Sequence, residues 1–258
     1  MQLTSAQNPL LKTIRRAASA GRPTEDGLVV SEGPHLLEEA LRSEWRIEQI
    51  FATPAARALY ADLLREARCE IADVSARAFA AMAATERTQE VLALLRPRVW
   101  KWEDLTGESA LVVVMDGVQD PGNAGTIVRS AEAFGATGVI FLKGCARVAN
   151  GKLLRATAGS IFRMPFLEGV SAAELIGHMQ ASKIKLYALV QSATKDLPET
   201  NLRDECALAV GGEGAGISAA ILAEAQTVRI PTRNVESLNA AMACSVALFL
   251  AQQQRNAS

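Results

Sequence analysis

Five short, nearly uninterrupted apolar runs in the second half of the chain constrain its fold more than any other feature. They are LVVVMD (111–116), GVIFL (138–142), KLYALV (185–190), ALAVGG (207–212) and TVRIP (227–231). Strands that helices cover on both faces have this composition, whereas strands with one solvated face alternate apolar and polar residues. The intervening residues 126–134 have helical character and end at Gly135, which suits a left-handed C-terminal cap. We therefore predict an α/β fold with a C-terminal parallel sheet and helices on both of its faces.

The first half of the chain has a weaker α/β pattern. Strand character occurs at 28–33, 47–52, 70–74 and 89–95, and helical spacing of apolar residues occurs at 34–43 and 54–67. The stretch RPRVWKWEDLTGES (96–109) carries charge, proline and glycine but no period. The prediction is a small α/β domain over 1–98, a linker over 99–109 and a second domain over 110–258.

Composition excludes several classes of protein. Hydrophobic residues make up 49% and charged residues 21% of the 258, as in an ordinary folded protein. Apolar runs stay well short of the roughly 20 residues of a membrane span, and the polar, basic N-terminus lacks the apolar core of a signal peptide. The four cysteines are too scattered for a zinc site or a disulfide framework. We expect a cytoplasmic protein with free thiols, no bound metal and no membrane contact.

Basic residues gather in two stretches, although the net charge is −1. The first 22 residues contain four basic and no acidic side chains, and the segment between Glu132 and Glu168 contains five basic ones and no carboxylate. Two such stretches suit a surface that binds a polyanion. For either stretch alone, ordinary solvated charge is an equal alternative.

Three polar or glycine-rich loops follow predicted strands, where open α/β sheets bind ligands. The first, 116–135, contains Asn123 and Arg129, and the third, 230–243, contains Ser237 and Asn239. Helix capping by Asn123 or Ser237 is the simpler alternative for these two loops. The second loop, GGEGAG (211–216), has neither the dinucleotide nor the phosphate-loop spacing. The carboxylate of Glu213 repels phosphates and favours a ligand with hydroxyls or a positive charge, such as S-adenosylmethionine.

Taken together and in this order, the loops resemble a known family. The segments NAGTIVRSAEAFGA, AVGGEGAGIS and VRIPTRNVESLNAAMACSVAL resemble the three signature motifs of the SpoU, or TrmH-like, branch of the SPOUT RNA methyltransferases. The resemblance covers residues 111–253. The first half is similar to the substrate-binding domain of many members, an α/β sandwich that resembles a ribosomal RNA-binding protein, and SEGPHLLEEAL (31–41) is the part that carries this similarity.

The resemblance implies an activity, an assembly and a backbone topology. It implies transfer of a methyl group from S-adenosylmethionine to a ribose 2′-hydroxyl, with 23S ribosomal RNA as the first candidate substrate and transfer RNA as the second. It also implies a homodimer joined partly through the C-terminal helix, and a trefoil knot in the catalytic domain. Because true knots are nearly absent from proteins, physical reasoning alone would have predicted an unknotted sheet.

The resemblance also assigns the site residues. Matched motif positions implicate Gly211, Gly212, Ile230, Pro231 and Leu238 in binding the cofactor. The catalytic set is Arg129 with Asn123, Glu213, Ser237 and Asn239. We expect Arg129 to grip a phosphate and stabilise the developing alkoxide, because a guanidinium stays protonated and is a poor base. The residues expected to bind RNA are Lys12, Arg15, Arg16, Lys143, Lys152 and Arg155.

Two alternatives from other classes remain at this stage. One is a non-catalytic RNA-binding protein on the same scaffold. The sequence disfavours it, because all the polar motif positions carry residues that are competent for catalysis. The other is a nicotinamide-dependent oxidoreductase, which the glycine spacing and the missing acidic residue for the ribose disfavour.

Overall fold

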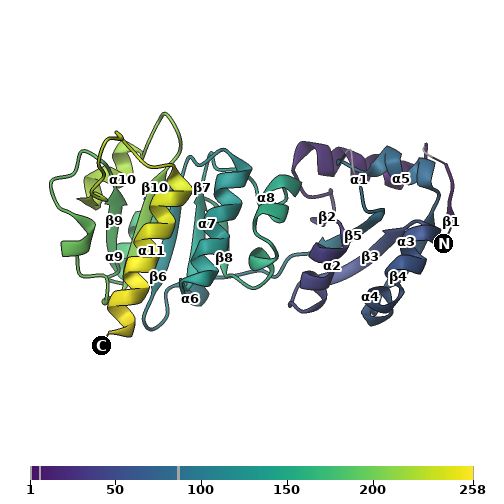
Figure 1. Cartoon of the computed structure of the whole chain (residues 1–258), viewed down its shortest axis with the longest axis horizontal. Helices are drawn as coiled ribbons and strands as arrows, with labels where there is room; N and C mark the ends of the chain where they lie inside the picture. Colours follow the sequence, from purple (N-terminus) through teal and green to yellow (C-terminus); the bar gives the residue numbers. More distant parts are fainter. Residues whose placement is uncertain (1, 6, 86–87, 258) are drawn as a thin grey trace. The chain divides into compact units, whose positions relative to one another are not determined.

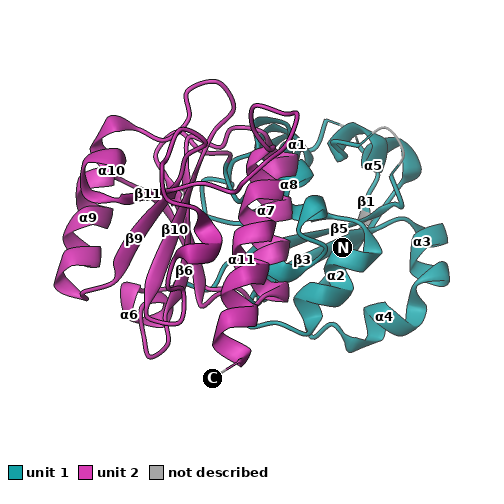
Figure 2. Ribbon diagram, turned by 60° about the vertical axis from the view of Figure 1, so that its left-hand side comes forward, with its two compact units in different colours: residues 1–99, 147–163 teal, residues 100–146, 164–258 magenta. Residues whose placement is uncertain are grey.

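The computed structural model describes residues 2–5, 7–85 and 88–257 and divides into two compact units (Figure 2). The first unit comprises residues 1–99 together with 147–163, and the second comprises 100–146 together with 164–258.

Within its described residues, the second unit forms a six-stranded sheet in the order β11-β9-β10-β6-β7-β8, and every pairing is parallel. This confirms the predicted parallel sheet. All five predicted strands occur within one or two residues of their expected starts, and β8 was not predicted. The strands are β6 (Leu111–Asp116), β7 (Gly138–Leu142), β8 (Phe166–Val170), β9 (Lys185–Leu189), β10 (Cys206–Gly211) and β11 (Gln226–Val228).

Helices cover both faces of this sheet, as predicted (Figure 2). On one face, α6 (Trp102–Leu105), α9 (Ala172–Ala181) and α10 (Ala219–Glu224) contribute buried side chains to a core cluster with the strands. On the other face, α7 (Pro121–Ala133) packs against α11 (Ala240–Asn256). None of the helices in the described part of the chain is long and apolar enough to cross a membrane. The trefoil knot stays a prediction.

The segment 99–109 is more ordered than a linker. It contains α6, whose Leu105 is fully buried in the core cluster of the second unit. The hydroxyl of Thr137 donates to the carbonyl of Leu105 at 2.7 Å. A single turn of helix with one buried leucine leaves no periodic signal in the sequence, which is why the sequence pattern predicts a linker here.

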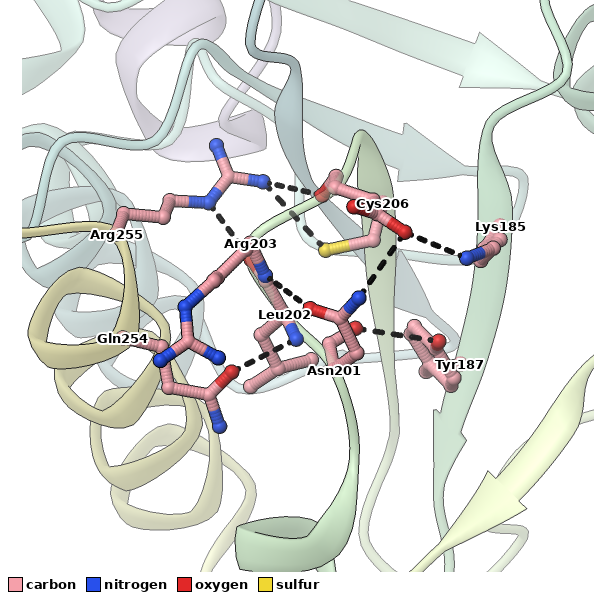
Figure 3. A network of polar contacts seen from close by, with 9 residues as sticks. Lys185, Tyr187, Asn201, Leu202, Arg203, Cys206, Gln254 and Arg255 are labelled. Atoms are coloured by element: carbon pink, nitrogen blue, oxygen red, sulfur yellow. Dashed lines mark hydrogen bonds and ion pairs between the residues drawn. The ribbon is translucent and has the colours of Figure 1, made fainter. Parts of the chain in front are cut away.

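The C-terminal end of α11 is tied to the start of the sheet by a network of hydrogen bonds (Figure 3). The Arg255 guanidinium donates to the carbonyls of Leu202, Ser109, Ala110 and Asp204 at 2.6 to 3.0 Å. The neighbouring Gln254 accepts from the backbone N–H of Leu202 and donates to the carbonyl of Thr200. This network holds in place the helix whose other end carries Asn239.

Within its described residues, the first unit contains a mixed five-stranded sheet in the order β1-β4-β3-β5-β2. Strands β1 and β3 run parallel to β4, while β2 and β3 run antiparallel to β5. The four predicted strands are present, and β1, α1 and α5 were not predicted. The expected helix over 54–67 is divided into two at Tyr60. The strands are β1 (Gln2–Leu3), β2 (Val29–Glu32), β3 (Arg46–Ala52), β4 (Glu70–Val74) and β5 (Val91–Arg96), and the helices of this part of the chain are α1 (Pro9–Ala20), α2 (Pro34–Leu41), α3 (Pro54–Leu59), α4 (Ala61–Glu66) and α5 (Ala76–Met82).

Residues 147–163 differ from the expected domain division. They form α8 (Gly151–Ala156) and the short 3-10 helix η1 (Ser160–Phe162), and they pack with the first unit, although the sequence division placed them in the second. The ring of Phe162 meets that of Trp45 edge-on at 5.0 Å, and both side chains are buried. The apolar contacts that hold this segment therefore come from residues more than 100 positions earlier.

Candidate active site

A cavity of about 470 Å³ opens at the carboxyl ends of β9 and β10 in the second unit. It brings together the end of β9, the glycine-rich loop and the segment that leads into α11. A second cavity of about 80 Å³ shares part of this lining and adds Ile230. The larger cavity is lined by Leu189, Val190, Gln191, Val210, Gly211, Gly212, Glu213, Gly214, Gly216, Ile217, Ser237, Leu238, Asn239, Ala240 and Ala243.

The glycine-rich loop is folded so tightly that two of its glycines have no room for a side chain. A Cβ on Gly211 would lie 2.2 Å from the carbonyl carbon of Gly216, and one on Gly212 would lie 2.0 Å from the carbonyl oxygen of Gly117. The N–H of Gly212 donates to the Asp116 carbonyl at 2.8 Å, which joins this loop to the one after β6. Both glycines are therefore required by backbone packing, and they leave bare backbone at the cavity wall.

Three polar side chains from the three loops form one hydrogen-bonded cluster. Oε1 of Glu213 accepts from Nδ2 of Asn123 at 2.7 Å and from Nδ2 of Asn239 at 3.1 Å. Nδ2 of Asn239 also lies 3.2 Å from Oδ1 of Asn123. Residues 90 and 116 positions apart along the chain thus meet at the cavity, as the three motifs predicted.

The side-chain amide of Asn239 is oriented by capping the start of α11. Its Oδ1 accepts from the backbone N–H groups of Ala241 and Met242 at 2.9 and 3.4 Å and caps α11. The amide nitrogen is therefore directed to Glu213. An asparagine is suited to this position because one side chain must both accept at the helix start and donate to a carboxylate.

The simple capping alternatives for Asn123 and Ser237 are wrong. The N-cap of α7 is Asp120, whose Oδ1 accepts from the backbone N–H of Asn123 at 2.8 Å, so Asn123 lies within the first turn. The N-cap of α11 is Asn239, and Ser237 lies two residues before it. Both side chains therefore need an explanation other than capping.

The cavity lining carries a single charged side chain among the described residues. Among the described residues that line it, Glu213 is the one ionisable side chain. The remaining lining is apolar or neutral, with the hydroxyl of Ser237 and the amides of Gln191 and Asn239. The arrangement suits a ligand with a cationic centre, and it opposes a ligand whose phosphate would lie against the carboxylate.

The cysteines of the second unit are unsuited to act as nucleophiles. Burial raises the pKa of the Cys244 thiol to about 12, and it also raises the pKa values of Cys145 and Cys206 above the usual range. Because the thiolate is the reactive form, these side chains are inert at neutral pH. No metal-binding group of three or more His, Cys, Asp or Glu side chains occurs in the described ranges.

Arg129 and Pro231 lie outside the lining of both cavities. Arg129 is exposed on α7, six residues after Asn123, and has no hydrogen bond or ion pair to any other described residue. The other residues expected at the cofactor and catalytic site line one cavity, except Asn123, which joins it through Glu213, and Ile230, which lines the smaller one.

The residues expected to bind RNA fall in both units. Lys12, Arg15 and Arg16 on α1 and Lys152 and Arg155 on α8 are exposed in the first unit. Lys143 is exposed in the second unit, directly after β7.

Sequence analysis missed Gln191 and Ala243. Gln191 follows the apolar run 185–190, so its position at a strand end was an available signal; its Nε2 donates to the Thr232 hydroxyl at 3.0 Å. Ala243 lies one turn into α11, and a single alanine in an apolar helix carries no signal.

A parallel sheet with a glycine-walled pocket at its strand ends defines an α/β protein that binds a small ligand. Residues 110–249 match the SpoU rRNA Methylase family, and residues 8–93 match the MRM3-like substrate binding domain. The chain therefore belongs to the SpoU rRNA methylase family.

Relatives and solved structures agree with this membership. The chain is 31% identical over 250 residues to the 23S rRNA (guanosine(2553)-2′-O)-methyltransferase RlmP of Bacillus subtilis, covering 96% of this chain and 98% of that protein. The crystal structure of the SpoU methyltransferase AviRb from Streptomyces viridochromogenes superposes with a TM-score of 0.86 at 26% identity, covering 97% and 98%. An AdoMet-bound rRNA methyltransferase from Sinorhizobium meliloti gives 0.86 at 26% identity, covering 98% and 97%.

Proposed function

We propose that this enzyme transfers a methyl group from S-adenosylmethionine to a ribose 2′-hydroxyl of 23S ribosomal RNA. It is an RNA methyltransferase of the SpoU family, and S-adenosylmethionine is its methyl donor. The observation that carries the proposal is the meeting of Gly211, Leu238 and the Asn123–Glu213–Asn239 cluster at one cavity.

The cavity fits the methyl donor in size and chemistry. Its volume of about 470 Å³ lies within the range of small-molecule sites. Gly211 and Gly212 contribute to the cavity wall, and Leu238 supplies an apolar wall. The carboxylate of Glu213 is complementary to a sulfonium. When bound, S-adenosylmethionine supplies an electrophilic methyl group with a good leaving group.

The protein must position and activate the hydroxyl nucleophile, because a ribose hydroxyl is weakly nucleophilic at neutral pH. We assign Arg129 to a phosphate beside the target ribose, where its fixed positive charge stabilises negative charge on the attacking oxygen. The proton then leaves to phosphate or water. Asn123, Ser237 and Asn239 orient the nucleotide and the carboxylate. Positioning and electrostatics of this kind are large enough to account for such catalysis.

A homodimer formed through α11 is part of the proposal. Met242, Val246 and Phe249 are 60%, 44% and 50% exposed, and they repeat at helical spacing along one side of this helix. An exposed apolar stripe of this kind is typical of a protein interface.

The cytoplasm is the proposed location, since ribosomal RNA is the proposed substrate.

Transfer to defined RNAs tests the activity and the substrate together. Purified protein is incubated with methyl-labelled S-adenosylmethionine and unmodified transcripts of 23S ribosomal RNA or of transfer RNAs, and nuclease digests are analysed for methylated nucleosides. We expect a 2′-O-methylated nucleoside from 23S RNA and none with Asn123→Ala. Methylation of a base, or transfer to transfer RNA alone, would overturn the proposed reaction or the proposed substrate.

A further inference from the structure

The segment 147–163 belongs by sequence to the methylase part of the chain but packs with the first unit. It lies inside the residues that match the SpoU family, 110–249, yet clusters with the first unit. A Cβ on Gly159 would lie 2.4 Å from Oε2 of Glu39, and the Arg163 guanidinium forms an ion pair with the same carboxylate. With the Trp45–Phe162 ring contact, these interactions fix the segment on the first unit.

The start of α8 lies against the end of α1 (Figures 1 and 2). Gly21 caps α1 in the left-handed conformation, with a φ of 58°. A Cβ on Gly21 would lie 3.0 Å from Nδ2 and 3.3 Å from Cα of Asn150. Asn150 is the N-cap of α8, where its Oδ1 accepts from the N–H of Lys152 at 2.8 Å. The two helix ends thus touch, although they are about 130 residues apart.

Both helices present basic side chains to solvent and contain no acidic residue. On α1 the buried residues are Leu11, Ile14 and Ala17. The basic residues Lys12, Arg15 and Arg16 of this helix are exposed, and exposed Arg22 follows directly after the cap. On α8, Leu153 and Leu154 are buried while Lys152 and Arg155 are exposed. The contact at Gly21 joins the two groups of positive charge, which lie in separate stretches of the sequence.

We propose that α1 and α8 form one continuous surface that binds the phosphate backbone of the substrate RNA. The proposal rests on the proposed function, because it names the protein surface that holds the same substrate. Fixed cations along two touching helices attract a polyanion through its phosphates without reading its sequence. In this arrangement a segment of the region that matches the SpoU family helps to bind the substrate RNA.

Salt dependence of RNA binding measures this surface directly. Neutralising a phosphate contact lowers the slope of log K against log salt by about 0.7 to 0.9. The variants are Lys152→Gln/Arg155→Gln on α8, Lys12→Gln/Arg16→Gln on α1, and all four together. The matched control is Lys183→Gln/Arg203→Gln, which removes the same charge from exposed positions of the second unit. Binding of unmodified 23S ribosomal RNA is measured between about 50 and 500 mM salt, a tenfold range over which phosphate contacts weaken strongly.

We expect each double variant to lower the slope by about 1 to 2 and the quadruple variant by about the sum, with the control unchanged. Binding to an unrelated RNA should fall in parallel. If the α8 pair leaves the slope unchanged while the α1 pair lowers it, or if the control lowers it equally, the composite surface is wrong. Calorimetric binding of S-adenosylmethionine and methyl transfer by the unaltered protein report separately on the proposed function, so the two failures are distinguishable.

Discussion

Glu213 brings a negative charge to a cavity otherwise lined by neutral groups. A sulfonium is attracted by that charge, whereas the neutral thioether of S-adenosylhomocysteine is not. We expect Glu213→Gln to weaken S-adenosylmethionine binding about three- to tenfold and to change S-adenosylhomocysteine binding much less. Titration calorimetry with both ligands measures the difference. Glu236→Gln removes an exposed carboxylate that directly precedes the lining residue Ser237 but does not itself line the cavity. It is the control and should bind both ligands normally. Equal losses for the two ligands would show that Glu213 does not act through charge.

Arg129 is exposed and makes no hydrogen bond to another described residue, so its guanidinium is available to a substrate phosphate. Arg129→Ala should reduce methyl transfer by about 100-fold or more, while S-adenosylmethionine binds with unchanged affinity. Arg129→Lys distinguishes a general base from an electrostatic role, because lysine loses a proton more readily but cannot make a bidentate phosphate contact. Substantial recovery in the lysine variant, with an optimum shifted to lower pH because the ordinary pKa of lysine is below that of arginine, would favour a base over the electrostatic role. The readouts are transfer rate against pH and calorimetry.

At the start of α11, one side chain, Asn239, both caps the helix and donates to Glu213 in the site. Asn239→Ala removes the cap and should lower the free energy of unfolding by about 1 kcal/mol. Asn239→Ser keeps a capping oxygen, so stability should change by less than about 0.5 kcal/mol, but the donor to Glu213 is lost. Both variants should be impaired in methyl transfer. Denaturant unfolding and transfer assays check this, and a fully active serine variant would refute the positioning role.

The sequence predicted elements and site residues wherever the signal was local. The strands β6, β7 and β10 are recognisable because their residues are buried on both faces. Strand β8 was missed because it lies at the sheet edge, where Glu168 and Gly169 are exposed. The meeting of Asn123, Glu213 and Asn239 followed from the motif resemblance, since no local pattern links residues 90 or more positions apart. The packing of residues 147–163 on the first unit was not predictable because it depends on Trp45 and Glu39.

At the scale of the whole molecule, the exposed stripe on α11 is the basis for the proposed dimer. Val246→Glu places a charge in the middle of that stripe and should convert the dimer into a monomer, because burying an unpaired carboxylate at an interface is costly. Light scattering after size-exclusion chromatography measures the mass. Gln226→Glu adds the same charge to an exposed position on β11, outside the stripe on α11, and should leave the dimer intact. A Val246→Glu protein with the mass of a dimer would place the interface elsewhere.

We propose that the three loops of the second unit together bind the methyl donor. Ala243 lines both cavities and lies on the first turn of α11, so Ala243→Phe fills the space without disturbing the glycine-rich loop. The decisive measurement is titration calorimetry of S-adenosylmethionine with the unaltered protein and with this variant, together with their melting temperatures. We expect binding of one donor per chain by the unaltered protein and its loss in the folded variant. Undiminished binding by Ala243→Phe would contradict the account.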